Sequence, residues 1–206
     1  QYCLIAWPCN KDLYGKIIDK ARDEVANVIN EIAKNEHVIV FSNKEDINEI
    51  ENKTDHKNID ILECKLDDSW MRDIAPIFYN EDEKLKSISF EFNGYGKYPD
   101  YLNDNKISKF ISNYLNIPTK ISDLVIEGGA ITYDDKKNLF STKNVIFNKN
   151  RKQKHNSEHI INELKLLFDL NYIFLFENGL MEDDTDGHVD NLLCPIGENQ
   201  YLIATT

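Results

Sequence analysis

Basic residues are scarce in this sequence. Lys and Arg total 24 of 206 residues against 36 Asp and Glu, so the net charge at pH 7 is −12. A chain with this acidic excess repels nucleic-acid phosphates, and no basic stripe offsets the excess locally, so we expect no nucleic-acid partner. A small cationic molecule suits the charge better.

Cysteines and long apolar segments are also scarce. Cys3, Cys9, Cys64 and Cys194 are too scattered for a disulfide scaffold, and they lack the CxxC spacing of a structural zinc site. No apolar run approaches the roughly 18 residues that cross a membrane, and the first residues lack the pattern of a signal peptide. We therefore expect a soluble, cytoplasmic protein without membrane contact.

Apolar residues are nevertheless sufficient for a folded core. They make up 41% of the chain and include 10 Phe, 10 Tyr and 2 Trp, which excludes overall disorder. No linker rich in Pro, Gly or Ser interrupts the chain, so we expect one domain over residues 1–206. The chain begins with Gln1 and stops inside the apolar run 200–206 (QYLIATT). From this we expect truncation at the C-terminus, and by a few residues at the N-terminus.

Apolar periodicity predicts a chain of intermixed strands and helices, of the α/β or the α+β class. Short apolar runs indicate strands, and apolar residues at helical spacing indicate amphipathic helices. Strands are predicted at residues 2–7, 37–41, 59–64, 121–126, 131–134, 172–176 and 188–194, with a hairpin formed by 71–79 and 86–92. Helices are predicted at 12–34, 107–115 and 157–170, the last capped by Asn156 or Ser157.

Three polar segments adjoin these strands and could carry chemistry: 68–73 (DSWMRD), 127–130 (EGGA) and 183–191 (DDTDGHVDN). On a strand over 188–194, His188 and Asp190 share one face, where a base could lie beside a cation-binding carboxylate. Taken alone, the pair is more simply explained as an exposed strand edge. A pair of metal ligands is a third option, but nothing else in the chain supplies the missing His or Cys, so no metal site is expected.

Taken together, these segments and three others resemble the agmatine deiminase and bacterial-type peptidylarginine deiminase family. The further matching segments are AWP at 6–8, FNGYGKY at 92–98 and NKNR at 148–151, and the second polar segment matches as IEGGAI over 126–131. The resemblance is collinear and covers essentially the whole chain. A small difference is Tyr95, where tryptophan is expected in many relatives.

The resemblance implies the fold of the guanidine-modifying (pentein) superfamily, an α/β propeller of five ββαβ modules that this chain would hold incompletely. It also implies hydrolysis of agmatine to N-carbamoylputrescine and ammonia in putrescine biosynthesis, through a cysteine-bound amidino intermediate and without a metal or organic cofactor. The alternatives are an arginine or peptidylarginine deiminase of the same family, or a short non-catalytic homologue that binds guanidinium compounds. The full-length enzyme could be a homodimer.

Carried over by motif, the resemblance implies specific roles for five residues. Asp73 and Asp190 would bind the guanidinium nitrogens, because a carboxylate accepts paired hydrogen bonds from a planar cation. His188 would be the general acid and base, and Glu127 would hold its orientation. Trp70 would help to line the substrate pocket.

Two further implications concern the acidic loop and the nucleophile. Asp184, within the acidic loop at 182–186, would favour the second positive charge of agmatine. In the family the nucleophilic cysteine follows a glycine-rich segment and a histidine near the C-terminus, and no cysteine here has that context. We therefore expect no nucleophile within this chain, and the chain alone is expected to be inactive.

Overall fold

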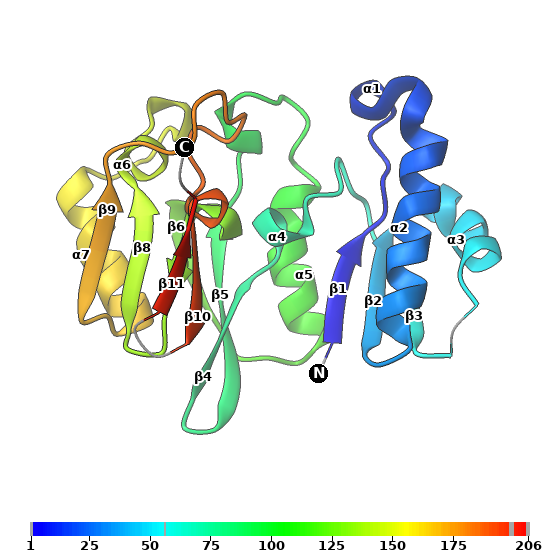
Figure 1. Cartoon of the computed structure of the whole chain (residues 1–206), viewed down its shortest axis with the longest axis horizontal. Coiled ribbons are helices and arrows are strands. Elements are labelled where there is room, and N and C mark those ends of the chain that lie inside the picture. Colours follow the sequence, from blue (N-terminus) through cyan, green and yellow to red (C-terminus); the bar gives the residue numbers. More distant parts are fainter. Residues whose placement is uncertain (1, 56, 198–199, 205–206) are drawn as a thin grey trace. The chain divides into compact units, whose positions relative to one another are not determined.

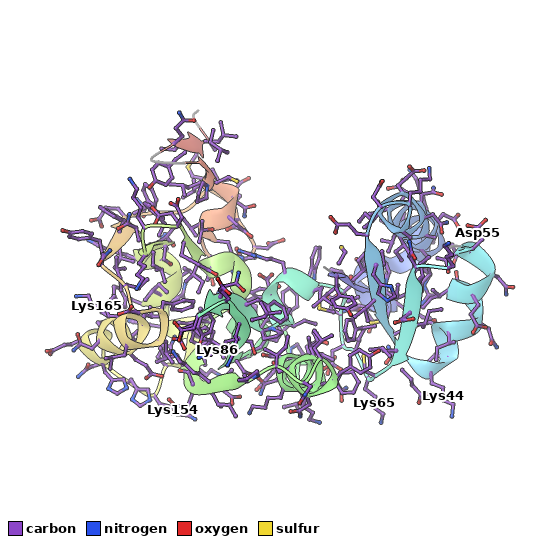
Figure 2. The ribbon with its side chains drawn as sticks, turned by 90° about the horizontal axis from the view of Figure 1, so that it is seen from below. Lys44, Asp55, Lys65, Lys86, Lys154 and Lys165 are labelled. Carbon is purple, nitrogen blue, oxygen red and sulfur yellow. The ribbon has the colours of Figure 1, made fainter. Side chains whose placement is uncertain are left out.

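The computed structural model describes residues 2–55, 57–197 and 200–204, and the chain separates into two compact units. The first unit comprises residues 1–71 and 100–104, and the second comprises 72–99 and 105–206. Exposed charged side chains such as Lys44, Asp55, Lys154 and Lys165 project outward from their own unit (Figure 2). Among the described residues, no helix combines the length and apolar content needed to span a bilayer. The predicted mixture of helices and strands is confirmed.

The first unit is a parallel three-stranded sheet with helices packed against it (Figure 1). Its elements are β1 (Tyr2–Ala6), α1 (Lys11–Tyr14), η1 (Gly15–Ile17), α2 (Ile18–Ala33), β2 (His37–Ser42), η2 (Lys44–Asp46), α3 (Ile47–Lys53) and β3 (Ile59–Glu63). The strands lie in the order β1-β2-β3, as helical crossovers between parallel strands produce. Val38 and Val40 of β2 form the core with Ala26 and Ile29 of α2 and Ile50 of α3.

The helix predicted over 12–34 is interrupted, so that prediction is wrong in detail. Gly15 adopts a φ of +52°, a left-handed backbone conformation that ends α1, and α2 starts only at Ile18. Leu13 and Ile17, expected on the buried face of one long helix, are 49% and 62% exposed. The apolar spacing continues across the interruption, which is why periodicity alone does not reveal it.

The second unit contains two copies of a ββαβ module and a final hairpin (Figure 1). In each module an antiparallel strand pair is followed by a helix and by a third strand that runs parallel to the second. The first module consists of β4 (Ile77–Glu81), β5 (Lys84–Glu91), α5 (Ile107–Tyr114) and β6 (Thr119–Val125). The second consists of β7 (Thr132–Tyr133), β8 (Asn138–Thr142), α7 (Ser157–Phe168) and β9 (Tyr172–Phe176). The hairpin pairs β10 (Leu193–Gly197) with β11 (Gln200–Ile203).

Short helical turns connect these strands. They are α4 (Met71–Ile74), η3 (Gly94–Gly96), η4 (Asp104–Lys106), η5 (Gly128–Ala130), α6 (Lys143–Ile146), η6 (Lys149–Arg151) and η7 (Val189–Asn191). Two of them correct sequence-based predictions. Residues 71–74 form α4 rather than the start of a strand, and the strand expected from His188 begins only at Leu193, after η7. Turns of three or four residues are too short to show a periodic pattern.

One apolar core joins the two modules of the second unit. Ile88 of β5 and Leu124 of β6 pack in the same cluster as Leu139 of β8 and Leu164 of α7, and none of the four is measurably exposed. Ala130, in the link between β6 and β7, is buried in this core as well. The polar residues just before that link are therefore held in place by close packing.

Asp104 makes the stability of the first unit depend on pH. Asp104 is only 2% exposed, and its carboxylate accepts hydrogen bonds from the backbone N–H groups of Asp67 (2.8 Å) and Asp68 (3.1 Å). Burial raises the pKa of Asp104 to about 7, although the hydrogen bond from the Asp67 N–H opposes the shift. A folded-state pKa above the unfolded value stabilises the fold at low pH, and this contribution is lost as the pH rises through about 7.

From this group we expect the free energy of unfolding to fall by about 1 kcal/mol between about pH 6 and pH 8, which lowers Tm by about 3 °C. In Asp104→Asn the amide resembles the protonated acid, so thermal unfolding followed by circular dichroism should show a flatter pH dependence. A variant whose Tm falls with pH as steeply as that of the parent chain would contradict this assignment.

Candidate active site

Links between modules bring the predicted catalytic residues together in the second unit. Asp73 lies in α4 before the first module, Glu127 follows β6, and His188 and Asp190 lie between β9 and β10. A Cβ atom added to Gly129 would lie 2.4 Å from His188 Nδ1 and 2.8 Å from both Asp73 Oδ1 and Asp190 Oδ2. These three side chains therefore surround Gly129, while the catalytic roles assigned to them stay predictions.

His188 lies between two carboxylates. Its side chain is 4% exposed, with Nδ1 3.7 Å from Asp73 Oδ1 and Nε2 3.5 Å from Glu127 Oε2. Both separations exceed a normal hydrogen bond, and Nε2 has no hydrogen-bond partner in the described part of the chain. Burial alone would lower the pKa of His188, but the interaction with Glu127 and the charge of Asp73 outweigh it and raise the pKa above its usual value. Such a histidine is suited to proton transfer.

Asp73 has a hydrogen-bond donor on each of its oxygens. The Tyr95 hydroxyl donates to Asp73 Oδ2 at 2.8 Å, and the backbone N–H of Gly129 donates to Oδ1 at 2.9 Å. Burial raises the pKa of Asp73, even though the charge of His188 and both hydrogen bonds oppose the shift. Tyr95 has a φ of +57°, which is unfavourable for a tyrosine, so the backbone is strained where it presents this hydroxyl.

Asp190 lies on the solvent side of this group. Its side chain is 35% exposed and has an oxygen 3.9 Å from Arg72 Nε. His188 and Asp190 do not occupy one face of a strand, as the sequence-based argument assumes, but flank the buried Val189 at the start of η7. Both side chains still reach Gly129, because the three-residue turn directs them to the same side.

Arg151 is a residue of this site to which the sequence analysis assigns no role. Its side chain has no exposed surface, and its Nε donates to Oε1 of the equally buried Glu127 at 2.9 Å. In the sequence Arg151 appears only within the matching segment NKNR, in a basic run that is typical of a solvated surface. No local pattern reveals a buried arginine, because its partners lie far away in the sequence.

Most aspartates of the acidic loop form hydrogen bonds or ion pairs within the protein. Asp183 accepts hydrogen bonds from three backbone N–H groups just after it, and Asp186 forms ion pairs with Lys97 and Arg151, both at 2.7 Å. The Asp184 side chain is exposed and makes no hydrogen bond or ion pair with any described residue. Of these three aspartates, Asp184 is therefore the one that stays open to a second positive charge on a ligand.

Comparison with known proteins identifies the family of the chain that carries this site. The profile of the Porphyromonas-type peptidyl-arginine deiminase family matches residues 1–206. The chain belongs to this family. The resemblance drawn from its sequence segments is thereby confirmed, and the side chains that surround Gly129 lie within a deiminase-family fold.

Relatives of this deiminase-family chain include named agmatine deiminases. A provisionally named agmatine deiminase of Mycoplasma capricolum subsp. capricolum is 31% identical over 210 residues, which cover 99% of this chain and 57% of the relative. The agmatine deiminase of Pseudomonas aeruginosa (strain LESB58) is 28% identical over 209 residues, covering 98% and 57%. A structure of a Cys-to-Ser variant of C. jejuni agmatine deiminase with substrate bound has a TM-score of 0.87 at 26% identity, covering 98% and 60%. This chain thus spans 57–60% of the length of these relatives.

The cysteines of this family member do not indicate a nucleophile. Burial raises the pKa of Cys9 to about 12 and that of Cys64 to about 11, which leaves both as unreactive thiols at neutral pH. Burial also raises the pKa of Cys3. Cys194 is exposed on β10, where its Sγ lies 3.6 Å from the carbonyl oxygen of Pro195.

Trp70 belongs to the first unit rather than to the unit that holds the predicted catalytic residues. It is 48% exposed, and its indole N–H donates a hydrogen bond to Asp68 Oδ2 at 3.0 Å. The ring is thus fixed at one edge and open to solvent over about half of its surface. Its place in the substrate pocket of this deiminase-family chain stays a prediction.

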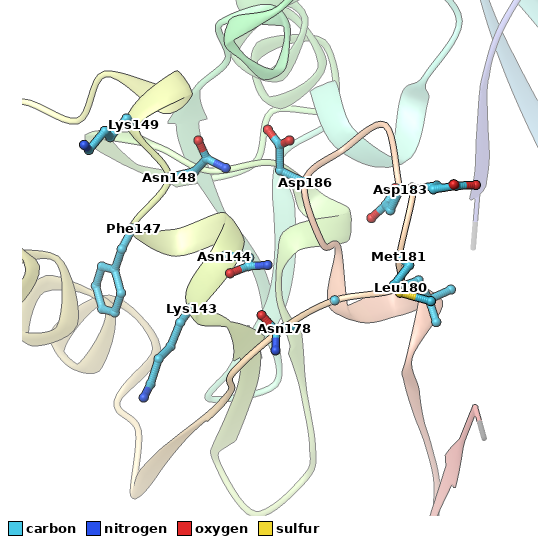
Figure 3. A pocket seen from close by; sticks show the side chains of 12 residues that line it. Lys143, Asn144, Phe147, Asn148, Lys149, Asn178, Leu180, Met181, Asp183 and Asp186 are labelled. Atoms are coloured by element: carbon cyan, nitrogen blue, oxygen red, sulfur yellow. The ribbon is translucent and has the colours of Figure 1, made fainter. Parts of the chain in front are cut away.

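A hollow of about 800 Å³ opens beside the acidic loop (Figure 3). It is lined by Lys143, Asn144, residues 147–149, residues 178–183 and Asp186, and its size is that of a small-molecule site. None of the four predicted catalytic residues belongs to this lining. Within the described part of the chain, the hollow is therefore distinct from the place where the predicted catalytic side chains meet.

Proposed function

We propose that this chain supplies the guanidinium-binding and acid–base groups of an agmatine deiminase, which hydrolyses agmatine to N-carbamoylputrescine and ammonia. The observation that carries the proposal is the convergence of Asp73, Asp190 and His188 around Gly129. Two carboxylates beside a histidine suit a planar cation that donates several N–H bonds and then loses one nitrogen as ammonia. The agmatine deiminases among the relatives, one of them solved with substrate bound, support this assignment.

In the proposed reaction Asp73 and Asp190 accept hydrogen bonds from the guanidinium while a cysteine thiolate attacks its carbon. One C–N bond breaks as His188 donates its proton to the departing ammonia, which leaves an amidino group on the sulfur. The neutral His188 then takes a proton from water, the resulting hydroxide adds to the amidino carbon, and the C–S bond breaks to release N-carbamoylputrescine. Glu127 keeps the imidazole oriented in both steps.

We assign the nucleophile to none of the four cysteines in these residues, so the 206-residue chain alone should bind agmatine without hydrolysing it. The chain spans 57–60% of its relatives' length. We further propose that the two ββαβ modules are parts of a five-module propeller and that residues 1–206 belong to that single domain. The homodimer and the cytoplasmic location stay predictions.

The cations bound to the acidic loop favour agmatine over arginine as the substrate. Arginine would bring a carboxylate, which calls for a positively charged partner. Arg151 already uses all its N–H donors within the protein, and Lys97 is bound to Asp186 and to the carbonyl oxygen of Asp184. Neither of these two cations is therefore available for a carboxylate, and the exposed Arg72 lies 3.9 Å from Asp190 Oδ2, beside a proposed ligand of the guanidinium end. Agmatine, which ends in an amine instead, has no need of such a cation.

The proposal is tested by expressing the protein from its complete gene and measuring the ammonia that it releases. Agmatine, free arginine and a peptidyl-arginine are compared as substrates. Release should be fastest with agmatine, and His188→Ala should lower kcat by about 10²- to 10⁴-fold. Asp190→Ala should raise the KM for agmatine as well. Release mainly from arginine or peptidyl-arginine would move the chain to the other branch of the family. Binding of agmatine without ammonia from any substrate would indicate the non-catalytic homologue.

A further inference from the structure

Arg151 is a buried cation with every hydrogen-bond donor occupied. Its Nε donates to Glu127 Oε1 at 2.9 Å, and its Nη2 donates to Glu127 Oε2 at 3.4 Å and to Thr185 O at 2.6 Å. Its Nη1 donates to Asp186 Oδ2 at 2.7 Å and to Tyr95 O at 3.1 Å. These bonds use all five N–H groups of an arginine. The guanidinium is therefore not free to bind a ligand, and its role must lie in the groups that it holds.

Glu127 is the first of these groups. Its side chain has no exposed surface, and a buried carboxylate is costly unless a cation pairs with it. Arg151 meets both carboxylate oxygens in a fork, which fixes the plane of the group as well as compensating its charge. The Oε2 atom in this fork is also the oxygen that lies 3.5 Å from His188 Nε2. The orientation of Arg151 therefore sets the position of the carboxylate that faces the imidazole.

The loop that carries His188 is the second group. Thr185 and Asp186, which both accept hydrogen bonds from Arg151, precede His188 by three and two residues. Asp183 closes the same loop, because its Oδ2 accepts a hydrogen bond from the His188 N–H at 2.9 Å. One guanidinium thus holds the carboxylate opposite the imidazole and also the backbone that leads to it.

We propose that Arg151 is the positioning residue for His188, acting through Glu127 and through the loop at Thr185 and Asp186 rather than by contact with the substrate. The inference rests on the proposed function, in which His188 transfers protons. Loss of the guanidinium would leave Glu127 buried without a counter-charge, so that the carboxylate would take up a proton or turn away. Either event removes the anion next to His188 Nε2.

Several charged groups around His188 determine how this change would be measured. Asp73 faces Nδ1 from α4, Glu127 faces Nε2, and Asp190 belongs to the same turn, while the ring of Tyr95 lies 5.9 Å from the imidazole. Burial lowers the pKa of His188, whereas the carboxylates raise it, with Glu127 acting most strongly among them. Without an ionised Glu127 in place, the pKa of His188 should therefore fall.

The test is an NMR titration of the His188 Cε1–H in the 206-residue chain, assigned with His188→Gln. The midpoint should be lower in Arg151→Met than in the parent. It should be intermediate in Arg151→Lys, which keeps the charge but not the fork. Arg22→Met is the matched control, because Arg22 is also buried and pairs with two carboxylates, Asp46 and Glu49, in the first unit. This control should lose stability and leave the His188 midpoint unchanged.

An unchanged or raised midpoint in both Arg151 variants would overturn the inference, because a Glu127 carboxylate that stays in place without the guanidinium raises the pKa of His188. If the Met variant does not fold, the Lys variant alone decides. In the protein from the complete gene, Arg151→Lys should lower kcat for agmatine about ten- to a hundredfold with little change in KM. A raised KM at constant kcat would show that Arg151 binds the substrate instead. Since the titration needs no substrate, its outcome is separate from that of the ammonia assay, which judges the proposed function.

Discussion

In the protein from the complete gene, replacing Gly129 by alanine is expected to lower the rate of the proposed agmatine hydrolysis about a hundredfold or more while leaving the fold intact. The new Cβ would lie 2.4 Å from His188 Nδ1 and 2.8 Å from carboxylate oxygens of Asp73 and Asp190. These neighbours are side-chain atoms rather than backbone, so they can shift at a smaller cost than a backbone group, and the second unit should still fold. They are also the groups proposed to bind and protonate the substrate, so any rotation misplaces the chemistry. Steady-state ammonia release and Tm measure the two effects separately.

Gly128→Ala is the matched control, because it adds the same methyl group one residue earlier. There the Cβ would lie 2.0 Å from the backbone carbonyl oxygen of Arg72, which cannot rotate away. Overpacking of this kind costs about 1–3 kcal/mol, so this variant should lose Tm as well as activity. Full activity in Gly129→Ala, or an equal loss of Tm in both variants, would contradict the geometry described for the site.

Replacing Asp73 by asparagine is expected to weaken agmatine binding about a hundredfold and, at the same time, to stabilise the fold. Binding weakens because a charged acceptor for the guanidinium is lost. Stability rises because burial raises the pKa of Asp73, so its ionised form is disfavoured in the fold at neutral pH. A carboxyl group whose pKa is higher in the folded state than in the unfolded state stabilises the fold at pH values below the unfolded-state pKa. This contribution is lost as the pH rises. The gain from asparagine should therefore be present at pH 7 and disappear near pH 4, where the carboxyl group of the unfolded chain is itself largely protonated.

Calorimetric titration with agmatine and thermal unfolding at both pH values test the Asp73→Asn variant. The hydrogen bonds from the Tyr95 hydroxyl and the Gly129 N–H can be kept in altered form, since an amide has both an acceptor and a donor. Asp55→Asn, at an exposed position, should change neither quantity. An affinity for agmatine equal to that of the parent chain would argue against Asp73 as a guanidinium ligand. A Tm of the variant below that of the parent at pH 7 would argue against the view that the fold disfavours the ionised Asp73.

Elements with clear apolar periodicity were predictable from the sequence. The helix α7 begins after Asn156, whose side chain accepts a hydrogen bond from the His159 N–H as a cap should. The predicted hairpin is formed by β4 and β5, with Asp82 and Glu83 at positive φ in its turn. The break at Gly15 was not predictable, because the conformation of one residue decides it and the apolar spacing runs on unchanged.

The site was predictable only in part, since residue spacing alone left each polar segment open to a simple structural explanation. The family resemblance singled out Asp73, Glu127, His188 and Asp190, and the structure brings them into one place. The strand predicted over His188 and Asp190 was wrong, because these residues lie at the three-residue turn η7. The contacts of Arg151 could not be foreseen, since a buried arginine is defined by distant partners rather than by its neighbours in sequence.

The distribution of the site over links between modules also bears on how the protein is made. A nascent chain that has left the ribosome only as far as β9 already carries Asp73, Tyr95 and Glu127 but still lacks His188. Until the link between β9 and β10 emerges, Asp73 and Glu127 lack the imidazole that later lies between them. Contacts between segments so distant in sequence form slowly. A guanidinium ligand that needs both Asp73 and Asp190 can therefore bind only after the link between β9 and β10 has been synthesised.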